Sequence, residues 1–237
     1  MIHIENLVKS FGKLAVLKNV SLDFPAGEVV ALIGPNGSGK TTLIKSILGL
    51  VVPDGGTLTL DGQNILQGWE YRSQIGYMPQ IGRYPEQMKI RQVFEMMKDL
   101  RSSVKSLDEE LIADFGLQGM MEKRMGTLSG GTRQKVSAAL AFMFLPKLYI
   151  LDEPTAGLDP VASEHLKNKI LKQKKQGSLT LVTSHNMSEV EELADRVVFL
   201  VDGVVKFNLT ISELLEGTGE SKLGKALAKR MEGEVYA

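Results

Sequence analysis

The sequence predicts an α/β fold with a small antiparallel β subdomain and an inserted helical subdomain. Three observations support this prediction. A glycine-rich loop of the pattern G-x-x-x-x-G-K-T follows a short apolar run and precedes a segment with helical spacing. Short runs typical of strands occupy the first 30 residues, and residues from about 85 to 127 show helical spacing that no strand pattern interrupts.

Length and composition narrow the class of protein without identifying it. The chain has 237 residues, which suits one large domain or a core with a small subdomain. Lysine plus arginine and aspartate plus glutamate both number 28, so charge offers no argument for binding nucleic acid or anionic lipid. Cysteine is absent, which excludes a disulfide framework and a thiolate metal site.

Hydropathy predicts no membrane span. The longest apolar run, residues 136–146, is far shorter than the roughly 20 residues that cross a bilayer. The first five residues show neither the charge nor the apolar stretch of a signal peptide. We therefore expect a soluble protein that reaches a membrane only through a partner.

The first half of the chain predicts strands followed by helices. Residues 29–33 form the apolar strand before the glycine-rich loop, and residues 57–60 form a strand that ends in a turn at Asp61-Gly62. With the strands of residues 1–30, the second of these predicts an antiparallel sheet. Residues 88–100 and 107–115 have helical spacing, and Gly116 ends the second helix.

The second half returns to alternating helices and strands. We predict helices over 130–145 and 161–176, strands over 148–151 and 179–183, and a hairpin over 197–207 that turns at Asp202-Gly203. The lysines that end the helix 161–176 suit a solvated helix terminus better than a phosphate patch. Ser188–Glu191 has the pattern of a capping box. The residues from 211 to 237 predict a polar helical tail.

The glycine-rich loop has the composition that a polyphosphate site requires. Its glycines let backbone N–H groups turn inward and approach a phosphate closely, and the following helix adds its positive end. Lys40 is expected to reach the β- and γ-phosphates of a nucleotide, and the Thr41 hydroxyl to ligate Mg²⁺. A chance glycine-rich turn is the alternative, and the flanking strand and helix argue against it. The residues assigned to the nucleotide are Gly34, Pro35, Asn36, Gly37, Ser38, Gly39, Lys40, Thr41 and Thr42.

Two adjacent carboxylates follow the apolar strand 148–151. Side chains alternate along a strand, so Asp152 and Glu153 diverge. Asp152 fits the role of Mg²⁺ ligand, and Glu153 the role of the base that activates a water. Two acidic residues in an ordinary turn are the alternative, although buried strands rarely end in paired charges without a task.

A second anion site is predicted at Leu128–Thr132. Ser129 suits a helix N-cap, and two glycines follow it at a helix N-terminus, although a plain cap is the simpler alternative. The segment resembles the signature motif of ATP-binding-cassette (ABC) ATPases, usually written LSGGQ, with Thr132 in place of the common glutamine. The resemblance implies that Ser129, Gly130 and Gly131 contact the γ-phosphate held by a second chain. We expect Thr132 to have a weak effect, because Ser129 and backbone N–H groups make the anion contact.

The remaining assignments depend on this resemblance. His185, after a strand, is similar to the family's switch histidine, which contacts the γ-phosphate; alone, it would more often be structural, as we expect for His3 and His165. Gln80 is similar to the Q-loop glutamine, which touches Mg²⁺ or the attacking water. Its position just before the predicted helical subdomain supports that role, because a glutamine after a proline is otherwise ordinary in a loop.

Two further motifs match the family: the D-loop and an aromatic residue near the start of the chain. Ala156–Asp159 is similar to the D-loop, which runs along the dimer interface, so Asp159 is assigned to the site. Phe11 matches the aromatic residue that stacks on adenine, and Val16 is expected near the ribose. A buried core position for Phe11 is the alternative from the residue alone.

All these motifs occur in family order over about residues 1–210. The resemblance implies a P-loop NTPase core, the ABC ATPase domain, over 1–210, a helical subdomain inserted at about 85–145, and a helical tail over 211–237. It further implies an ATPase that closes as a homodimer, or as a heterodimer with a second cassette, around two ATP molecules with Mg²⁺. We expect Glu153, His185 and Gln80 to act in hydrolysis and Thr41, Gln80 and Asp152 to hold the metal.

Three hypotheses describe what the ATPase drives. The first is a transporter subunit, peripheral on the cytoplasmic face of the membrane, that docks a separate polytopic membrane chain on its Q-loop and helical subdomain. The short tail and the amino-acid sequences of residues 129–137 and 152–160 resemble exporter-type cassettes, in particular the copper ABC system that matures nitrous-oxide reductase. The second is a non-transport ABC ATPase acting on DNA or the ribosome; neither coiled coils nor tandem cassettes are present, and no nucleic acid partner is expected. The third, a binding module without hydrolysis, conflicts with Glu153 and His185.

Overall fold

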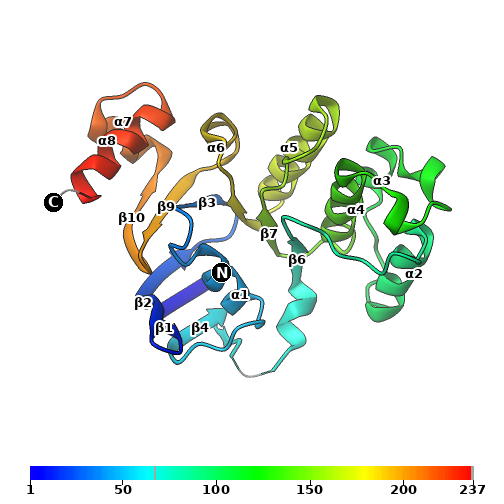
Figure 1. Ribbon diagram of the computed structural model, residues 1–237, viewed down its shortest axis with the longest axis horizontal. Helices are drawn as coiled ribbons and strands as arrows, with labels where there is room; N and C mark the ends of the chain where they lie inside the picture. Colours follow the sequence, from blue (N-terminus) through cyan, green and yellow to red (C-terminus); the bar gives the residue numbers. More distant parts are fainter. Residues whose placement is uncertain (67, 236–237) are drawn as a thin grey trace. The chain divides into compact units, whose positions relative to one another are not determined.

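The computed structural model describes residues 1–66 and 68–235, with side chains described as far as residue 232 (Figure 1). The chain forms two compact units: Met1–Arg72 with Leu179–Ala237, called unit 1, and Ser73–Ser178, called unit 2. The end of the predicted tail, residues 236–237, lies outside the described residues. The domain boundaries drawn from the sequence at 85–145 and 211–237 remain predictions.

Unit 1 contains the antiparallel sheet that the sequence predicts. Its strands are β1 (Ile2–Phe11), β2 (Leu14–Phe24), β4 (Gly55–Leu60) and β5 (Gln63–Asn64), and their order in the sheet is β2-β1-β4-β5. All three pairings are antiparallel. Ile2, Ile4 and Leu7 of β1 are buried while most of their neighbours are exposed, as expected for a sheet with one solvated face.

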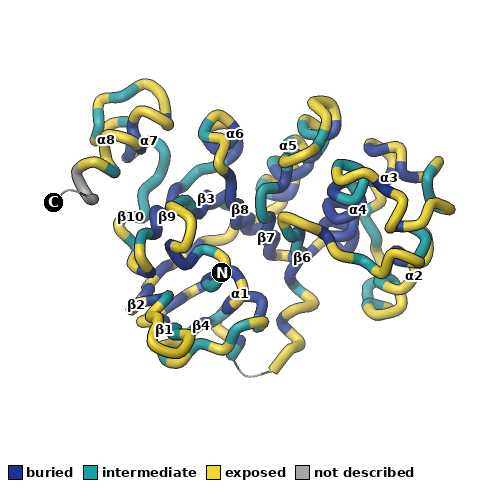
Figure 2. The backbone as a smooth tube through the Cα atoms, viewed as in Figure 1, coloured by how far each residue is buried: buried dark blue, intermediate teal, exposed yellow. Residues whose placement is uncertain are grey.

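Four further strands of unit 1 carry the glycine-rich loop. They are β3 (Val29–Ile33), β8 (Leu179–Thr183), β9 (Arg196–Val201) and β10 (Val204–Thr210), in the order β10-β9-β3-β8. β3 pairs in parallel with β8 and β9, and β9 and β10 form the predicted hairpin. β3 and β8 are almost entirely buried (Figure 2), which explains their unbroken apolar sequences.

The helices of unit 1 are α1 (Lys40–Ile47), α6 (Met187–Leu193), α7 (Ile211–Thr218) and α8 (Leu223–Val235). The predicted capping box at Ser188 is wrong, because the N-cap of α6 is Asn186. The Asn186 side chain accepts hydrogen bonds from the N–H groups of Ser188 and Glu189, at 3.1 and 3.4 Å. The Glu189 carboxylate accepts a bond from the Ser184 hydroxyl instead.

The C-terminal helices have an apolar face that the polar composition of the tail concealed. α7 begins with a capping box formed by Thr210 and Glu213. α8 packs on α6 and α7, and its residues Leu223, Ala226 and Leu227 are buried. No helix among the described residues is long and apolar enough to cross a bilayer.

Unit 2 pairs two parallel strands with the helical segments of the chain. The strands are β6 (Ile75–Met78) and β7 (Leu148–Asp152). The helices are α2 (Ile90–Leu100), α3 (Glu110–Asp114), α4 (Gly130–Phe142) and α5 (Pro160–Lys175), with short 3-10 turns η2 (Leu117–Met120) and η3 (Met125–Thr127). A further 3-10 turn, η1 (Glu70–Gln74), includes the last residues of the first segment of unit 1 and the first residues of unit 2. α4 ends three residues before the predicted Leu145, which has a left-handed backbone, φ 48°.

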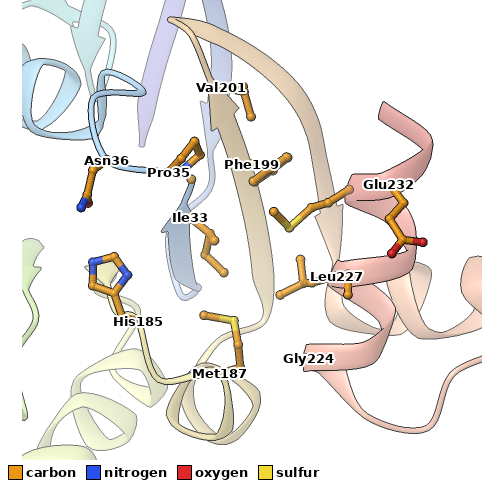
Figure 3. A pocket seen from close by; sticks show the side chains of 13 residues that line it. Ile33, Pro35, Asn36, His185, Met187, Phe199, Val201, Gly224, Leu227 and Glu232 are labelled. Carbon is orange, nitrogen blue, oxygen red and sulfur yellow. The ribbon is translucent and has the colours of Figure 1, made fainter. Parts of the chain in front are cut away.

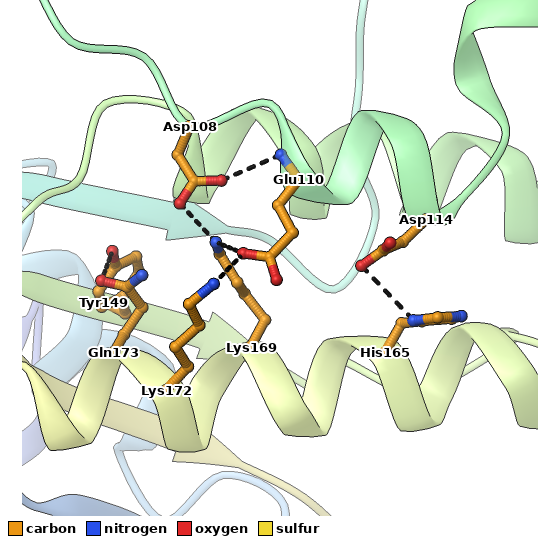
Figure 4. A network of polar contacts seen from close by, with 8 residues as sticks. All are labelled: Asp108, Glu110, Asp114, Tyr149, His165, Lys169, Lys172 and Gln173. Atoms are coloured by element: carbon orange, nitrogen blue, oxygen red, sulfur yellow. Dashed lines mark hydrogen bonds and ion pairs between the residues drawn. The ribbon is translucent and has the colours of Figure 1, made fainter.

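A buried lysine joins α5 to the start of α3 within unit 2 (Figure 4). Lys169 is almost completely buried and donates hydrogen bonds to Asp108 and Glu110. Lys172 donates a second bond to Glu110, at 2.7 Å, and these two lysines lower the pKa of the Glu110 carboxyl. His165 of α5 pairs with Asp114 at 3.5 Å, in agreement with a structural role. Lys169 of α5 therefore forms a buried ion pair with the start of α3 that the sequence pattern did not reveal.

Candidate functional site

The glycine-rich loop connects β3 to α1, and it leaves no room for a side chain at Gly34. A Cβ atom on Gly34 would lie 2.0 Å from the carbonyl oxygen of Leu200. Gly39 is the N-cap of α1 with φ 107°, a conformation that favours glycine. No side chain caps α1 by accepting a hydrogen bond from the first N–H groups of the helix. The loop therefore presents backbone donors in the way an anion site requires.

The turn between β9 and β10 supports the loop from behind. The Gly203 N–H donates to the carbonyl oxygen of Ser38 at 3.0 Å, and the Lys18 N–H donates to the carbonyl of Gly203 at 2.8 Å. A Cβ atom on Gly203 would lie 2.3 Å from the carbonyl oxygen of Val16. Asp202 and Gly203 both have positive φ, as a type I′ turn requires. Sequence reasoning found this turn but did not connect it to the loop.

Three side chains of the loop suit a nucleotide with its metal. Lys40 Nζ donates hydrogen bonds to the carbonyl oxygens of Gly34 and Pro35, at 2.7 and 3.0 Å. The Ser38 hydroxyl is buried and has no hydrogen-bond partner in the structure, which is unusual for a buried polar atom. The Thr41 hydroxyl belongs to an exposed residue at the start of α1 and is an oxygen donor of the kind Mg²⁺ prefers. These groups fit a polyphosphate with Mg²⁺.

Two other predicted residues lie close to this loop in sequence order or in space. Thr42 continues α1, and its carbonyl oxygen accepts a bond from the Ser46 hydroxyl. Val16 is half-buried on β2, and its carbonyl oxygen would lie 2.9 Å from a Cβ atom on Gly39. Val16 is therefore beside the end of the loop at which α1 begins.

Phe11 occupies the exposed end of β1. Its side chain is 50 % exposed, so the alternative of a buried core phenylalanine is wrong. Lys9 Nζ lies 5.3 Å from the centre of the Phe11 ring. Asp54 accepts bonds from Lys9 Nζ and from the Ser10 N–H, which together lower the pKa of the Asp54 carboxyl. The strand end is thus anchored and Phe11 stays exposed, with Lys9 over one face of its ring.

His185 is exposed on the turn between β8 and α6. Ser184 stabilises this turn, because its hydroxyl donates to Glu189 at 2.8 Å and accepts from the Asn186 N–H at 3.0 Å. Asn186 then caps α6. The turn therefore fixes the backbone on both sides of the exposed residue His185.

The carboxylates and Gln80 belong to unit 2. Asp152 ends β7, and its charge adds to burial in raising the pKa of the Tyr77 hydroxyl. Glu153 has a left-handed backbone, φ 50°, which is uncommon for a residue with a side chain and is found at functional sites. Its carbonyl oxygen accepts from the Ala156 N–H at 3.1 Å. Gln80 is exposed two residues beyond β6.

The signature segment begins α4 with a side-chain cap. The Ser129 hydroxyl accepts from the Thr132 N–H at 3.1 Å, as predicted for an N-cap, and also lies 2.9 Å from the Thr132 hydroxyl. A Cβ atom on Gly130 would meet nothing within 4 Å. A Cβ atom on Gly131 would lie 2.5 Å from the carbonyl oxygen of Gly157. The signature segment and the D-loop of the same chain are therefore in contact.

Asp159 fastens the D-loop to both neighbouring helices. Its carboxylate caps α5 by accepting from the Ala162 N–H at 2.9 Å and pairs with Lys135 of α4 at 2.6 Å. Lys135 is the larger cause, and the Ala162 N–H the second, of a lowered pKa of the Asp159 carboxyl. Sequence reasoning identified Asp159 but missed Lys135, which only the fold brings to it.

Comparisons with known proteins identify the family of the chain. Residues 17–156 match the model of the family described as ABC transporter. The chain is 35 % identical to the lantibiotic transport ATP-binding protein SrtF of Streptococcus pyogenes, over 86 % of this chain and 89 % of SrtF. It is 33 % identical to the lipopolysaccharide export system ATP-binding protein LptB of Haemophilus influenzae, over 96 % of this chain and 94 % of LptB.

Solved structures show the same fold. A structure described as the ATP-binding subunit of an ABC transporter superposes with a TM-score of 0.91 at 30 % identity, covering 98 % of this chain and 99 % of that one. The cassette MJ0796, described as dimeric, gives a TM-score of 0.77 at 23 % identity, covering 89 % and 98 %. The chain belongs to the ABC transporter family. It is an ATP-binding subunit that hydrolyses ATP for transport.

Proposed function

We propose that two copies of this chain close head to tail around two ATP molecules with Mg²⁺, so that each site is built from both chains. The observation that carries this proposal is the open space at Gly130. Gly130 is exposed beside the capping Ser129 at the start of a long helix, and a Cβ atom added there would meet nothing within 4 Å, so an anion from outside can approach this helix end. The phosphate loop supplies donors from one chain, and Ser129, Gly130 and Gly131 supply them from the other.

Within each site the side chains have separate tasks. Lys40 and the loop N–H groups hold the phosphates, while Phe11 stacks on adenine with Val16 near the ribose. Thr41, Gln80 and Asp152 are the proposed Mg²⁺ ligands, directly or through water. Glu153 orients and deprotonates the attacking water, and His185 contacts the γ-phosphate, so that preorganised charges stabilise the transferring phosphoryl group. Asp159 borders the interface of the two chains.

The substitution Glu153→Gln tests this mechanism. Amide and carboxylate have nearly the same shape, so the variant keeps its contacts and loses the base. We expect turnover to fall by at least about a hundredfold, while ATP–Mg²⁺ binds and accumulates a dimer that sedimentation and light scattering detect. The matched control Glu5→Gln, at an exposed position on β1, keeps wild-type turnover and forms no lasting dimer.

Two results would contradict the proposal. One is a Glu153→Gln variant that binds ATP tightly and remains monomeric at every protein concentration. The other is a wild-type chain whose turnover per molecule is independent of concentration in dilute solution, because a composite site loses activity when the two chains separate.

We also propose that the chain works on the cytoplasmic face of a membrane, where a separate polytopic subunit docks on the region around Gln80 and α2. Ile81, beside Gln80, is 68 % exposed, and Met96 and Leu100 of α2 are exposed as well. Large apolar side chains exposed on one unit support contact with a protein partner. Ile81→Asp is expected to abolish co-purification with a detergent-solubilised membrane chain, whereas Leu50→Asp, at a 62 % exposed position in unit 1, preserves it.

For the direction of transport we propose export. SrtF is named for lantibiotic transport and LptB for lipopolysaccharide export. The sequences of residues 129–137 and 152–160 resemble exporter-type cassettes, including the copper-processing type. The described residues contain no cluster of three or more histidine, cysteine, aspartate or glutamate side chains able to hold a metal ion. In inside-out vesicles, whose cytoplasmic face carries the chain and is open to added ATP, ATP-driven accumulation of substrate would support export, and ATP-driven loss of a loaded substrate would contradict it.

A further inference from the structure

The C-terminal helix α8 closes a cavity against the phosphate loop and the turn of His185. The cavity measures about 710 Å³ and belongs entirely to unit 1. Figure 3 shows its two sides: Ile33, Pro35, Asn36 and His185 on one, and α8 with Leu227 on the other, with Met187 and Phe199 between them. A space of this size is within the range of about 300–1,000 Å³ typical of small-molecule sites.

The lining combines an apolar interior with a few polar groups at its margin. Ile33, Phe199, Leu227 and two methionines supply the apolar surface, and methionine adapts its shape to an occupant more readily than other apolar residues. Asn36, His185 and Glu232 supply the polar groups. Glu232 is the acidic residue among the described lining residues, which include no lysine or arginine. The α8 side of the margin, with Glu232, therefore favours a cation, whereas the loop side lies next to Lys40, whose Nζ donates to the carbonyl oxygens of Gly34 and Pro35.

The position of the cavity links it to ATP turnover. Gly34, Pro35 and Asn36 of the phosphate loop line it, and so does His185, the proposed γ-phosphate contact. An occupant between α8 and these residues would restrict the His185 ring and the loop backbone. α8 is held in place by its packing on α6 and α7, so the wall opposite the loop is a packed element of the fold.

We propose that this cavity binds a small molecule with an apolar body and a protonated amine, and that its binding slows ATP hydrolysis. The apolar body lies between Phe199, Leu227 and the methionines, and the amine pairs with Glu232. The binding site is independent of the proposed function, while the effect on turnover rests on it, because only that function gives His185 a task.

Methyl-labelled methionine tests the site directly without nucleotide. The chain has 11 methionines, of which Met187 and Met231 line the cavity. In methyl NMR we expect 4-phenylbutylamine, at about millimolar concentration, to shift the signals of these two and leave the others in place. The anion 4-phenylbutanoate, which has the same body, is expected to bind roughly threefold or more weakly. Shifts spread over all methionines, or equal affinity of the two probes, would overturn the proposal.

Two substitutions at exposed positions separate filling of the cavity from loss of charge. Ala228→Trp places a ring in the cavity and should abolish the amine-induced shifts, whereas Lys225→Trp, on α8 but outside the lining, should leave them unchanged. Glu232→Gln should remove the preference for the amine over the anion, and Glu216→Gln on α7 should retain it. If the Met187 and Met231 signals move with protein concentration alone, a second copy fills the cavity and the proposal is wrong.

ATP turnover then reports the coupling. At saturating 4-phenylbutylamine the wild-type rate should fall roughly fivefold or more, and the Ala228→Trp variant should not respond to the amine. Amine binding without any change of rate would overturn the coupling and leave the proposed hydrolysis intact. A wild-type chain with no ATPase activity would overturn the proposed function. The NMR shifts would still test whether the cavity binds the amine.

Discussion

The two glycine-rich loops of this protein begin helices in different ways. The phosphate loop leads into α1 through Gly39, and no side chain caps the helix. The signature segment leads into α4 through Ser129, whose hydroxyl accepts the Thr132 N–H and also lies within hydrogen-bond distance of the Thr132 hydroxyl. The first helix end lacks a side-chain partner for its donors, and the second already has one. The difference indicates that a phosphate completes the first loop, whereas the second is stable alone and offers its donors at Gly130.

The loops also differ in how they are supported. The phosphate loop rests on backbone atoms, since Gly203 donates to Ser38 and Gly34 lies against the carbonyl of Leu200. The signature segment rests partly on an ion pair, because Lys135 of its helix holds Asp159 of the D-loop. Backbone support does not depend on pH or salt, and an exposed ion pair does. This comparison yields four predictions, from the largest effect to the smallest.

Gly34→Ala should have the largest effect. The added Cβ would lie 2.0 Å from a backbone carbonyl that cannot move without shifting β9. We expect a loss of stability of about 3 kcal/mol and no measurable ATP binding in calorimetry. Gly37→Ala is the control, because its Cβ meets nothing within 4 Å and the cost is the positive φ alone, about 1 kcal/mol. Equal melting temperatures for the two variants would contradict the crowded geometry.

Gly131→Ala and Gly130→Ala should separate packing from ligand contact in the second loop. The methyl group at residue 131 would lie 2.5 Å from the Gly157 carbonyl and should destabilise the chain by about 2 kcal/mol. The methyl group at residue 130 enters open space, so thermal unfolding should change by no more than about 0.5 kcal/mol. ATPase activity at high protein concentration should nevertheless fall for Gly130→Ala. Full activity of that variant would argue against a composite site.

Thr132→Val should have a smaller effect. It removes the hydroxyl beside Ser129 and retains the backbone N–H that Ser129 caps. We expect a loss of about 1 kcal/mol in chemical unfolding, and Thr132→Ser should restore the stability. Turnover should change little, because Ser129 keeps its bond to the N–H of residue 132. A large loss of turnover with unchanged stability would show that residue 132 itself contacts the nucleotide.

Acid should weaken the support of the second loop before that of the first. The pKa of Asp159 is lowered in the folded chain, chiefly by Lys135, so its contribution to stability is complete above the unfolded pKa of about 3.9 and is lost as the pH falls through the folded value. The effect is small because the pair is exposed. Asp159→Asn should reduce the acid dependence of unfolding below about pH 5, and Asp61→Asn, on an exposed turn, should not.

Much of this protein was predictable from local pattern. The G-x-x-x-x-G-K-T loop between a strand and a helix, the antiparallel strands and the helical segments follow from spacing and composition, and the structure confirms them. The capping box at Ser188 was wrong because Asn186 accepts the same N–H groups two residues earlier. Several short polar side chains near a helix end can each act as its N-cap, and the sequence alone does not show which of them does.

The sequence by itself predicted which residues carry the chemistry, because phosphate, metal and water each require particular donors and acceptors at close spacing along the chain. Only the tertiary structure decided what lies behind them: the Gly203 turn under Ser38, Lys135 on Asp159, buried Lys169 between two carboxylates, and α8 across the cavity from His185. These contacts join residues that are tens of positions apart, and a long-range contact leaves no periodic mark in a single sequence. The functional residues stand in short segments that a sequence shows directly, whereas the contacts that hold these segments in place form only when the chain folds.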